Sequence, residues 1–214
     1  MATVLELNSA PSPQQIHHLA QCLQDGGVVA VPTDSFYALA ASPFNEMALE
    51  RLMHIKGERN HKPFPVLVGD PSQLDWLTEV IPDVARILMK EFWPGLLTLI
   101  FQARSTLSPI LTGGQGTIGI RQPNDPRVCE LMTHIGPLTG TSANRSGQPP
   151  AESVGDVMEQ LGAVVDVIVD GGPTPGGQPS TVLQILPKPR IIRQGAISRD
   201  RLQQILSASS IQLS

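Results

Sequence analysis

Four segments of the chain bring together side chains that bind phosphate and carboxylate groups, namely hydroxyls, amides, lysine and arginine. They are Val31–Tyr37 (VPTDSFY), Lys56–Pro63 (KGERNHKP), Gly140–Gly147 (GTSANRSG), and Pro179–Val182 (PSTV) together with Arg193–Gly195 (RQG). The first and third follow short apolar runs typical of buried strands, and ligands of α/β sheets bind at strand ends. Each segment alone also fits a capped turn or a plain loop, so a site is indicated by the set rather than by any one member.

The second segment is rich in cations. It places Lys56, Arg59 and Lys62 within seven residues, at the end of an apolar helical pattern. Cations are favourable near a helix C-terminus, which gives these residues a purely structural explanation. The same residues suit a triphosphate, because Lys offers a point charge and Arg a two-pronged donor.

The third segment carries phosphate-binding groups outside any common nucleotide motif. Residues 140–147 offer hydroxyls, an amide and Arg145 between two glycines, and the backbone N–H groups of such a loop can bind phosphate oxygens. The sequence contains no GxxxxGK[ST], GxGxxG, HExxH or GxSxG motif. The five histidines show no ligand spacing, so we expect no metal site formed by protein residues.

The elements that must position these segments alternate between helices and apolar strands. The patterns predict helices over 13–26, 45–56, 83–92, 154–161 and 199–206, and strands over 28–31, 65–68, 96–101, 117–120, 138–139, 164–169, 181–186 and 190–193. This order contains no repeat and predicts an α/β (or α+β) fold. We expect one domain over 1–214, with an open, twisted mixed sheet flanked by helices and a frayed tail after the last helix.

The composition excludes several classes of protein. The 214 residues carry 15 Lys and Arg against 19 Asp and Glu, a net charge of −4, which argues against a globally basic nucleic-acid binder. Hydrophobic residues make up 41% and charged residues 16%, which excludes disorder for most of the chain. The sequence shows no membrane-spanning run and no signal peptide, and its two cysteines, Cys22 and Cys129, lie far apart, so we expect a cytoplasmic protein with reduced thiols.

Charge is distributed unevenly along the chain. Basic residues cluster at 51–62 and 188–201, whereas residues 151–187 hold five acids and no Lys or Arg. This asymmetry predicts either one cationic face or cleft, or an ordinary solvated surface with chance clustering.

In their order and spacing, the four segments resemble the YrdC/Sua5 family, the threonylcarbamoyl-adenylate synthases. The matching motifs are PTDSFYALA (32–40), KGERNHKPF (56–64), WPGLLTLI (93–100), IRQP (120–123), TSANRSG (141–147), PSTV (179–182) and RQG (193–195). The resemblance covers about residues 14–197, and the SAN-x-SG element is its most specific part.

This resemblance implies a YrdC-like fold with a cationic concave cleft, and an enzyme that makes threonylcarbamoyl-AMP and pyrophosphate. The implied substrates are L-threonine, bicarbonate or CO2, and ATP with Mg²⁺. A separate threonylcarbamoyl-transferase complex would then use the product to modify adenosine 37 of tRNA. Direct binding of tRNA or double-stranded RNA stays open, as does a monomeric or homodimeric state.

Carried over residue by residue, the resemblance assigns two sets of contacts. The expected ATP contacts are Lys56, Arg59, Lys62, Thr98, Ser142, Asn144 and Arg193, of which Lys56, Arg59, Ser142 and Asn144 form the catalytic set. The expected threonine contacts are Thr33, Ser35, Tyr37, Arg121, Thr141 and Ser180, with Arg121 suited to a bidentate grip on the carboxylate.

The sequence departs from the family pattern at two positions. Glu58 stands where the family has its Arg, with Arg59 one residue later, and Ala38 replaces a glycine. These departures leave open a second interpretation, a divergent YciO-like paralogue that binds RNA or ribosomes without the synthase activity. Aromatic residues, which would stack on bases, make up only 4% of the chain, and this argues against RNA binding. A carbamoyl-adenylate module of hydrogenase-maturation proteins is a third interpretation. The chain resembles the short YrdC form rather than the longer Sua5 form.

Overall fold

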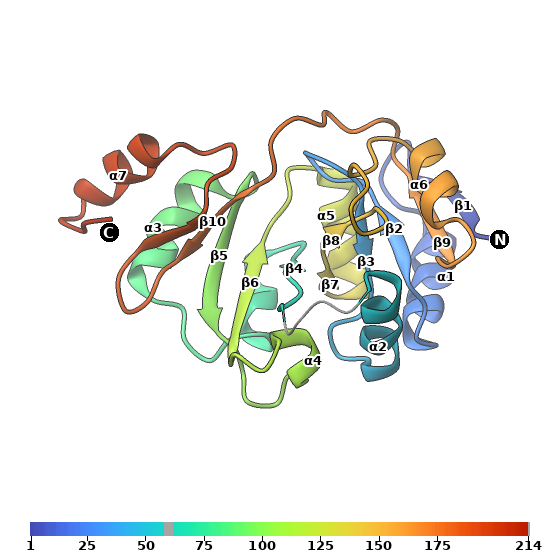
Figure 1. The fold of residues 1–214 in the computed structure, drawn as a ribbon, viewed down its shortest axis with the longest axis horizontal. Helices are drawn as coiled ribbons and strands as arrows, with labels where there is room; N and C mark the ends of the chain where they lie inside the picture. The colour runs from blue at the N-terminus through green and yellow to red at the C-terminus, as the bar shows by residue number, and fades with distance from the viewer. Residues whose placement is uncertain (58–61, 214) are drawn as a thin grey trace.

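The computed structural model describes residues 1–57 and 62–213, and Figure 1 shows their arrangement. The strands are β1 Thr3–Glu6, β2 Val29–Val31, β3 Ala38–Ala40, β4 Val66–Leu67, β5 Leu97–Gln102, β6 Thr117–Arg121, β7 Leu138–Thr139, β8 Thr141–Ser142, β9 Val167–Asp170, β10 Thr181–Gln184 and β11 Arg190–Arg193. The helices are α1 Pro13–Gln24, α2 Glu46–Ile55, α3 Asp83–Phe92, α4 Pro109–Thr112, α5 Pro126–Ile135, α6 Val154–Leu161 and α7 Arg199–Ser207, with a 3₁₀ helix, η1, over Pro71–Trp76.

The strands of the described residues divide over two mixed sheets, whereas the sequence predicted one. One sheet has the order β1-β9-β2-β3-β8 and the other the order β11-β10-β5-β6-β4-β7. They stand side by side in Figure 1, and the predicted class, mixed α/β with helices flanking open sheets, is confirmed. The difference arises because the apolar pattern predicts which residues form strands but not which sheet each strand joins.

The chain passes from one sheet to the other at Gly140, between β7 and β8. Its backbone N–H donates to the Pro65 oxygen at 2.8 Å. A Cβ at this position would lie 2.5 Å from Cγ of Leu67, so the close approach of the two segments requires glycine. The crossing brings Thr141 and Ser142 to the boundary between the sheets.

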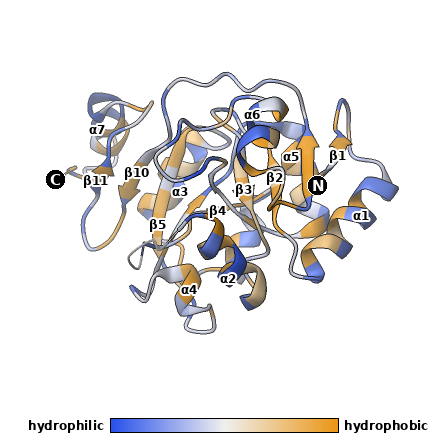
Figure 2. Ribbon diagram, turned by 45° about the vertical axis from the view of Figure 1, so that its right-hand side comes forward, coloured by the Kyte–Doolittle hydropathy of each residue, from blue (hydrophilic) through white to orange (hydrophobic). Residues whose placement is uncertain are grey.

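Strand β2 is buried on both faces, as its continuous apolar run predicted. Val28 and Ala30 pack in one hydrophobic cluster, whereas Val29 and Val31 pack in the other, because successive side chains of a strand point to opposite faces. Figure 2 shows the apolar colouring of the central strands. The end of β2 is therefore fixed firmly, and the polar segment 32–37 follows it directly.

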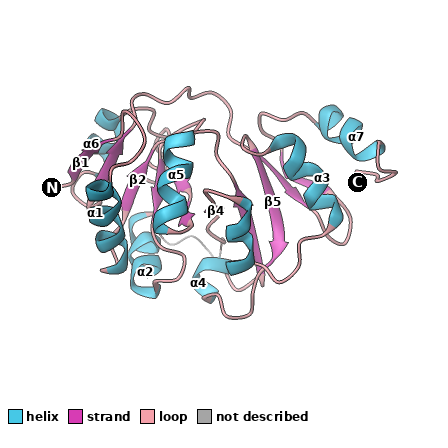
Figure 3. Ribbon diagram, turned by 180° about the vertical axis from the view of Figure 1, so that it is seen from behind, coloured by secondary structure: helices cyan, strands magenta, loops and turns pink. Residues whose placement is uncertain are grey.

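Helices pack on both sides of the sheets. Seen from behind, α1, α5 and α3 lie in front of the strands (Figure 3), whereas α6 lies on the front face in Figure 1 and α2 and α4 lie at the lower edge in both views. Helix α1 begins after Ser12, whose side chain accepts from the N–H of Gln15 in a reciprocal capping box. No helix of the described residues is long and apolar enough to cross a membrane.

An extended crossover, residues 171–180, connects β9 of one sheet with β10 of the other, along the top of Figure 1. It is attached to the segment after β2. The N–H of Gly176 donates to the Ser35 oxygen at 2.7 Å, and the Tyr37 hydroxyl donates to the Gly172 oxygen at 2.8 Å. These two hydrogen bonds fix the crossover against the polar segment 32–37.

Candidate functional site

A cavity of about 700 Å³ lies where the two sheets meet. It is lined by residues of β3 and β8 from one sheet and of β5, β6, β10 and β11 from the other. The expected site residues that line it are Thr33, Ser35, Tyr37, Lys62, Thr98, Arg121, Thr141, Ser142, Ser180 and Arg193. The structure therefore brings together most of the residues that the sequence placed in one site.

The charged lining of this cavity is cationic. Of the described residues, Lys62, Arg121 and Arg193 line it, and no Asp or Glu does. Lys62 is exposed at the mouth, whereas Arg121 is 6% exposed. Burial lowers the pKa of the Arg121 guanidinium, Asp34 beside it raises the pKa, and Arg193 lowers it again.

Arg121 ends strand β6 and is held by two protein acceptors. Its Nε donates to the Gly95 oxygen at 2.8 Å, and its Nη2 forms a buried ion pair with Oδ1 of Asp34. These contacts fix the plane of the guanidinium in the cavity wall. Asp34 belongs to the motif PTDSFYALA, but the motif alone predicted no role for it.

Thr33 and Ser35 form a closed turn after β2. The Thr33 hydroxyl donates to the Phe36 oxygen at 2.7 Å and accepts from the Ser35 N–H at 3.2 Å. Its oxygen also lies 3.2 Å from the Ser35 hydroxyl. Because the single hydroxyl proton of Thr33 goes to Phe36, Ser35 is the donor in the contact between the two hydroxyls, and it would have to turn away from Thr33 to donate to a ligand.

One hydrogen-bonded network joins residues expected to bind ATP with a residue expected to bind threonine. The hydroxyls of Thr98 and Ser180 lie 2.8 Å apart. Arg193 donates from Nη2 to the backbone oxygen of Ser180 at 2.9 Å and to its hydroxyl at 3.3 Å. Ser180 therefore connects the two expected subsites through its hydrogen bonds to Thr98 and Arg193.

The TSAN segment is bound to the end of helix α2 through Lys56. The Lys56 ammonium lies 2.8 Å from each of three acceptors: the Ser142 oxygen, the Asn144 oxygen and Oδ1 of Asn144. The Ser142 hydroxyl donates to the same Oδ1 at 2.6 Å. Asn144 is 8% exposed and donates from Nδ2 to the oxygens of Arg145 and Gln148.

Lys56 and Asn144 thus support the loop from behind, and neither is among the residues that line the cavity. Ser142 lines it directly. Arg59 and the adjacent Glu58 lie outside the described residues.

Tyr37 lines the cavity although it is fully buried, and its hydroxyl is bonded to the crossover at Gly172. Burial is the main cause that raises the pKa of this hydroxyl to about 12. Thr141 is 6% exposed and pairs with Leu39 in the first sheet. Ala38, which replaces the family's glycine, sits in regular strand β3 and packs in the hydrophobic core, so the extra methyl group is accommodated.

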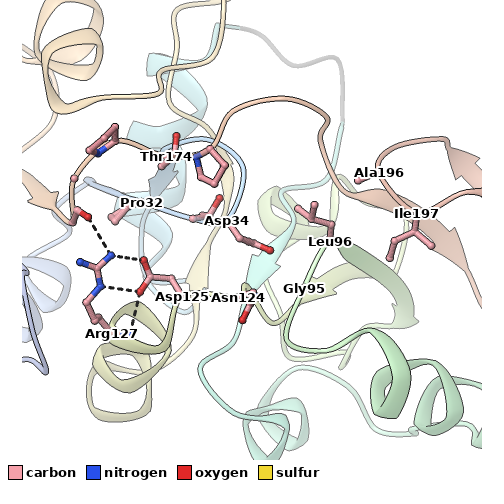
Figure 4. Close-up of a pocket in the computed structure, with 15 residues that line it drawn as sticks. Pro32, Asp34, Gly95, Leu96, Asn124, Asp125, Arg127, Thr174, Ala196 and Ile197 are labelled. Carbon is pink, nitrogen blue, oxygen red and sulfur yellow. Dashed lines mark hydrogen bonds and ion pairs between the residues drawn. The ribbon is translucent and has the colours of Figure 1, made fainter.

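A second cavity, of about 640 Å³, also borders the segment after β2 (Figure 4). Asp34 points into it, and Thr33 lines both cavities. An ion pair lines it: Arg127 donates to Asp125 at 2.9 Å and to the Gly171 oxygen at 3.1 Å. Asp125 also caps helix α5 through the N–H groups of Arg127 and Val128.

The described residues contain no cluster of three or more His, Cys, Asp or Glu that would hold a metal ion.

The two basic clusters of the sequence divide between the site and the surface. Lys62 and Arg193 reach the cavity, whereas Arg51 pairs with Asp166 and Arg201 pairs with Glu91 elsewhere. Charge clustering alone did not separate these two groups.

Comparison with known proteins relates most of the chain to one family. Residues 21–195 match the Sua5/YciO/YrdC family model, which is described as "Telomere recombination". The chain is 38% identical to the threonylcarbamoyl-AMP synthase of Bacillus subtilis over 90% of its length, but it spans only 56% of that relative. It is 34% identical to a putative threonylcarbamoyl-AMP synthase of Mycobacterium tuberculosis, covering 89% of this chain and 88% of the relative.

Solved structures agree with this relationship. Sua5 of Pyrococcus abyssi, solved with L-threonine, superposes with a TM-score of 0.89 at 29% identity, over 100% of this chain and 63% of that one. YciO of E. coli superposes with a TM-score of 0.82 at 28% identity, over 94% of this chain and 100% of that one.

Proposed function

Because the chain belongs to the Sua5/YciO/YrdC family, we propose that it forms L-threonylcarbamoyl-AMP and pyrophosphate from L-threonine, bicarbonate or CO2, and ATP. Support comes from relatives named as threonylcarbamoyl-AMP synthases and from a related structure solved with L-threonine. The alternative of an RNA-binding protein without this activity has no comparable support.

The proposed reaction needs two bond-forming steps. The amine of threonine attacks the carbon of CO2 and loses a proton, which gives a carbamate. A carbamate oxygen then attacks the α-phosphorus of ATP, and the bond between that phosphorus and the bridging oxygen to the β-phosphate breaks. Pyrophosphate leaves, and Mg²⁺ that arrives with the nucleotide neutralises its charge. The protein's part is to position the two substrates and to balance negative charge.

For the amino acid, we assign Arg121 the substrate carboxylate. Its guanidinium is fixed by Gly95 and Asp34 and lines the cavity. Ser35, Thr141 and Ser180 contribute hydroxyls around it, and Thr33 holds the turn that carries Ser35. Buried charge-assisted hydrogen bonds of this kind are the strong ones in proteins.

For the nucleotide, we assign the phosphates to Lys62 and Arg193, with the hydroxyl groups of Thr98 and Ser142 beside them. All four line the same cavity as Arg121. Lys56 and Asn144 act through the loop that carries Ser142. Arg59 stays a predicted ATP contact outside the described residues.

The single observation that carries this proposal is the charge of the cavity. Its described lining holds three cations and no carboxylate, in a chain whose net charge is −4. Such a lining favours a triphosphate together with an amino-acid carboxylate. We place the reaction in the cytoplasm, where a threonylcarbamoyl-transferase complex would consume the product to modify tRNA.

The direct test is pyrophosphate release from ATP and Mg²⁺ with bicarbonate, with and without L-threonine. We expect release that depends on L-threonine and is much weaker with L-serine. Folded protein that releases no pyrophosphate in response to threonine would contradict the proposal, and tight tRNA binding with a steep salt dependence would then favour the RNA-binding alternative.

A further inference from the structure

We propose that Asp34 is the positioning residue of the threonine subsite: its carboxylate holds the Arg121 guanidinium so that the remaining N–H groups of Arg121 face the substrate carboxylate. This inference rests on the proposed function, because it takes L-threonine as the ligand of Arg121.

The first step is a count of donors. A guanidinium has five N–H groups in a rigid plane. In Arg121, the Nε–H is given to Gly95, and one N–H of Nη2 is given to Asp34. Within the described part of the chain, Arg121 has no further acceptor, so both N–H groups of Nη1 and the outer one of Nη2 remain. Nη1 and Nη2 together form an end-on fork that matches a carboxylate.

The second step is the side from which Asp34 acts. Arg121 lines the cavity of about 700 Å³, whereas Asp34 lines the second cavity, of about 640 Å³. The carboxylate therefore reaches the guanidinium from behind and leaves the substrate side open. The two side chains are only 8% and 13% exposed, so water competes little with this ion pair.

The third step is the charge around Arg121. Arg193 is a second cation close enough to lower the pKa of Arg121, and Asp34 acts in the opposite direction. Without the carboxylate, the buried guanidinium of Arg121 would face the exposed cation of Arg193 with no balancing charge, and the Arg121 side chain would lose one of its two anchors. A single hydrogen bond from Nε to the neutral oxygen of Gly95 would leave the guanidinium plane free to rotate about the axis of that hydrogen bond.

The experiment compares Asp34→Asn with Asp125→Asn, a matched control. Both aspartates line the second cavity and pair with an arginine, but Asp125 pairs with Arg127 and does not contact Arg121. We expect Asp34→Asn to raise the KM for L-threonine and the Kd from calorimetry about tenfold, since it removes the charge but keeps an oxygen acceptor. The KM for ATP should stay within about twofold. Asp125→Asn should change Tm but neither constant.

The outcomes separate this inference from the proposed function. If the wild type binds L-threonine and Asp34→Asn weakens it, the positioning role stands even where no pyrophosphate is released. A wild type that does not bind L-threonine overturns it. So does unchanged or tighter binding in Asp34→Asn, because a carboxylate that occupied the substrate's place would compete with it. A lower kcat with a shifted pH profile and an unchanged threonine KM would make Asp34 a proton acceptor instead.

Should Asp34→Asn not fold, Asp34→Glu provides the second measurement, with folding checked by circular dichroism. It keeps the charge but changes its reach, so we expect a threonine Kd above that of the wild type. A Kd equal to that of the wild type would overturn the positioning role.

Discussion

The ammonium group of Lys56 donates two hydrogen bonds to Asn144, one to its backbone oxygen and one to its Oδ1, each at 2.8 Å. The same ammonium reaches the Ser142 oxygen at 2.8 Å. An ammonium has three N–H donors, and three acceptors of one short loop lie at bonding distance. Lys56 therefore fixes the loop that presents Ser142 to the cavity.

Replacing Lys56 by Met should damage both stability and catalysis. Lys56→Met removes the charged donor of the backbone oxygens of Ser142 and Asn144, and hydrogen bonds to charged groups contribute about 1.5–3 kcal/mol. We expect a lower Tm and a fall in kcat/KM of about 10- to 100-fold. The control is Lys62→Met, at an exposed position in the cavity lining, which should raise the KM for ATP and leave Tm unchanged. If Lys56→Met instead retains the wild-type Tm and changes only the KM for ATP, Lys56 contacts the nucleotide directly.

Two arginines of strand β11 should respond differently to truncation. Arg193→Ala removes a cation from the cavity lining and a donor from Ser180, so we expect a higher KM for ATP and a smaller rise in the KM for threonine. Arg190→Ala, on the same strand, loses only an exposed hydrogen bond to Gln184 and should change neither constant. Steady-state kinetics with each substrate varied in turn measures both. Equal effects of the two variants would show that Arg193 acts through general surface charge.

Strongly patterned elements could be predicted from the sequence. The apolar stripe and end signals predicted α3 at its observed bounds, Asp83–Phe92, and α6 at Val154–Leu161. Helix α5 was missed, although Asp125 and the proline at its first position are ordinary start signals. Strands β3 and β8, of three and two residues, were also missed.

Motif order could predict which residues gather at one cavity, but not which hydrogen-bonded partners hold them there. Motif order placed Arg121, Ser142 and Arg193 in one cavity, and they line it together. It could not show that Lys56 is bonded to the loop behind the cavity, because a lysine in a motif carries no information about where its ammonium points. Nor could it identify Asp34 as the partner of Arg121, since the two lie 87 residues apart.

The glycine of the RQG motif should be essential for packing. A Cβ on Gly195 would lie 2.2 Å from the Pro179 oxygen and 2.5 Å from the Ser180 backbone carbon, neither of which is a flexible side chain. Gly195→Ala should therefore displace Ser180 and lower the free energy of unfolding by about 1–3 kcal/mol. Gly155→Ala is the matched control, because its Cβ would meet nothing closer than 3.6 Å within helix α6. Chemical denaturation compares them. The control should gain up to about 1 kcal/mol from helix propensity, and an equal gain in Gly195→Ala would refute the steric argument.

Tyr37 should make the protein sensitive to alkali. Burial is the first cause that raises the pKa of its hydroxyl, from an ordinary 10.0 to about 12, so the folded state favours the neutral form. The stabilisation is complete below pH 10 and is lost as the pH rises towards 12, because the unfolded chain ionises first. Tyr37→Phe removes this titration together with the bond to Gly172, which costs about 1 kcal/mol at neutral pH.

Urea denaturation of both proteins between pH 8 and pH 12 measures the effect of Tyr37 by difference. The thiol of Cys129, whose pKa burial raises to about 11, titrates in this range in both proteins and cancels in the comparison. We expect the free energy of unfolding to fall more steeply above pH 10 in the wild type than in Tyr37→Phe, so that the two curves converge. Parallel curves would mean that the hydroxyl ionises as easily in the folded protein as in the unfolded chain. Burial of Tyr37 and its hydrogen bond to Gly172 would then contribute nothing to the loss of stability in alkali.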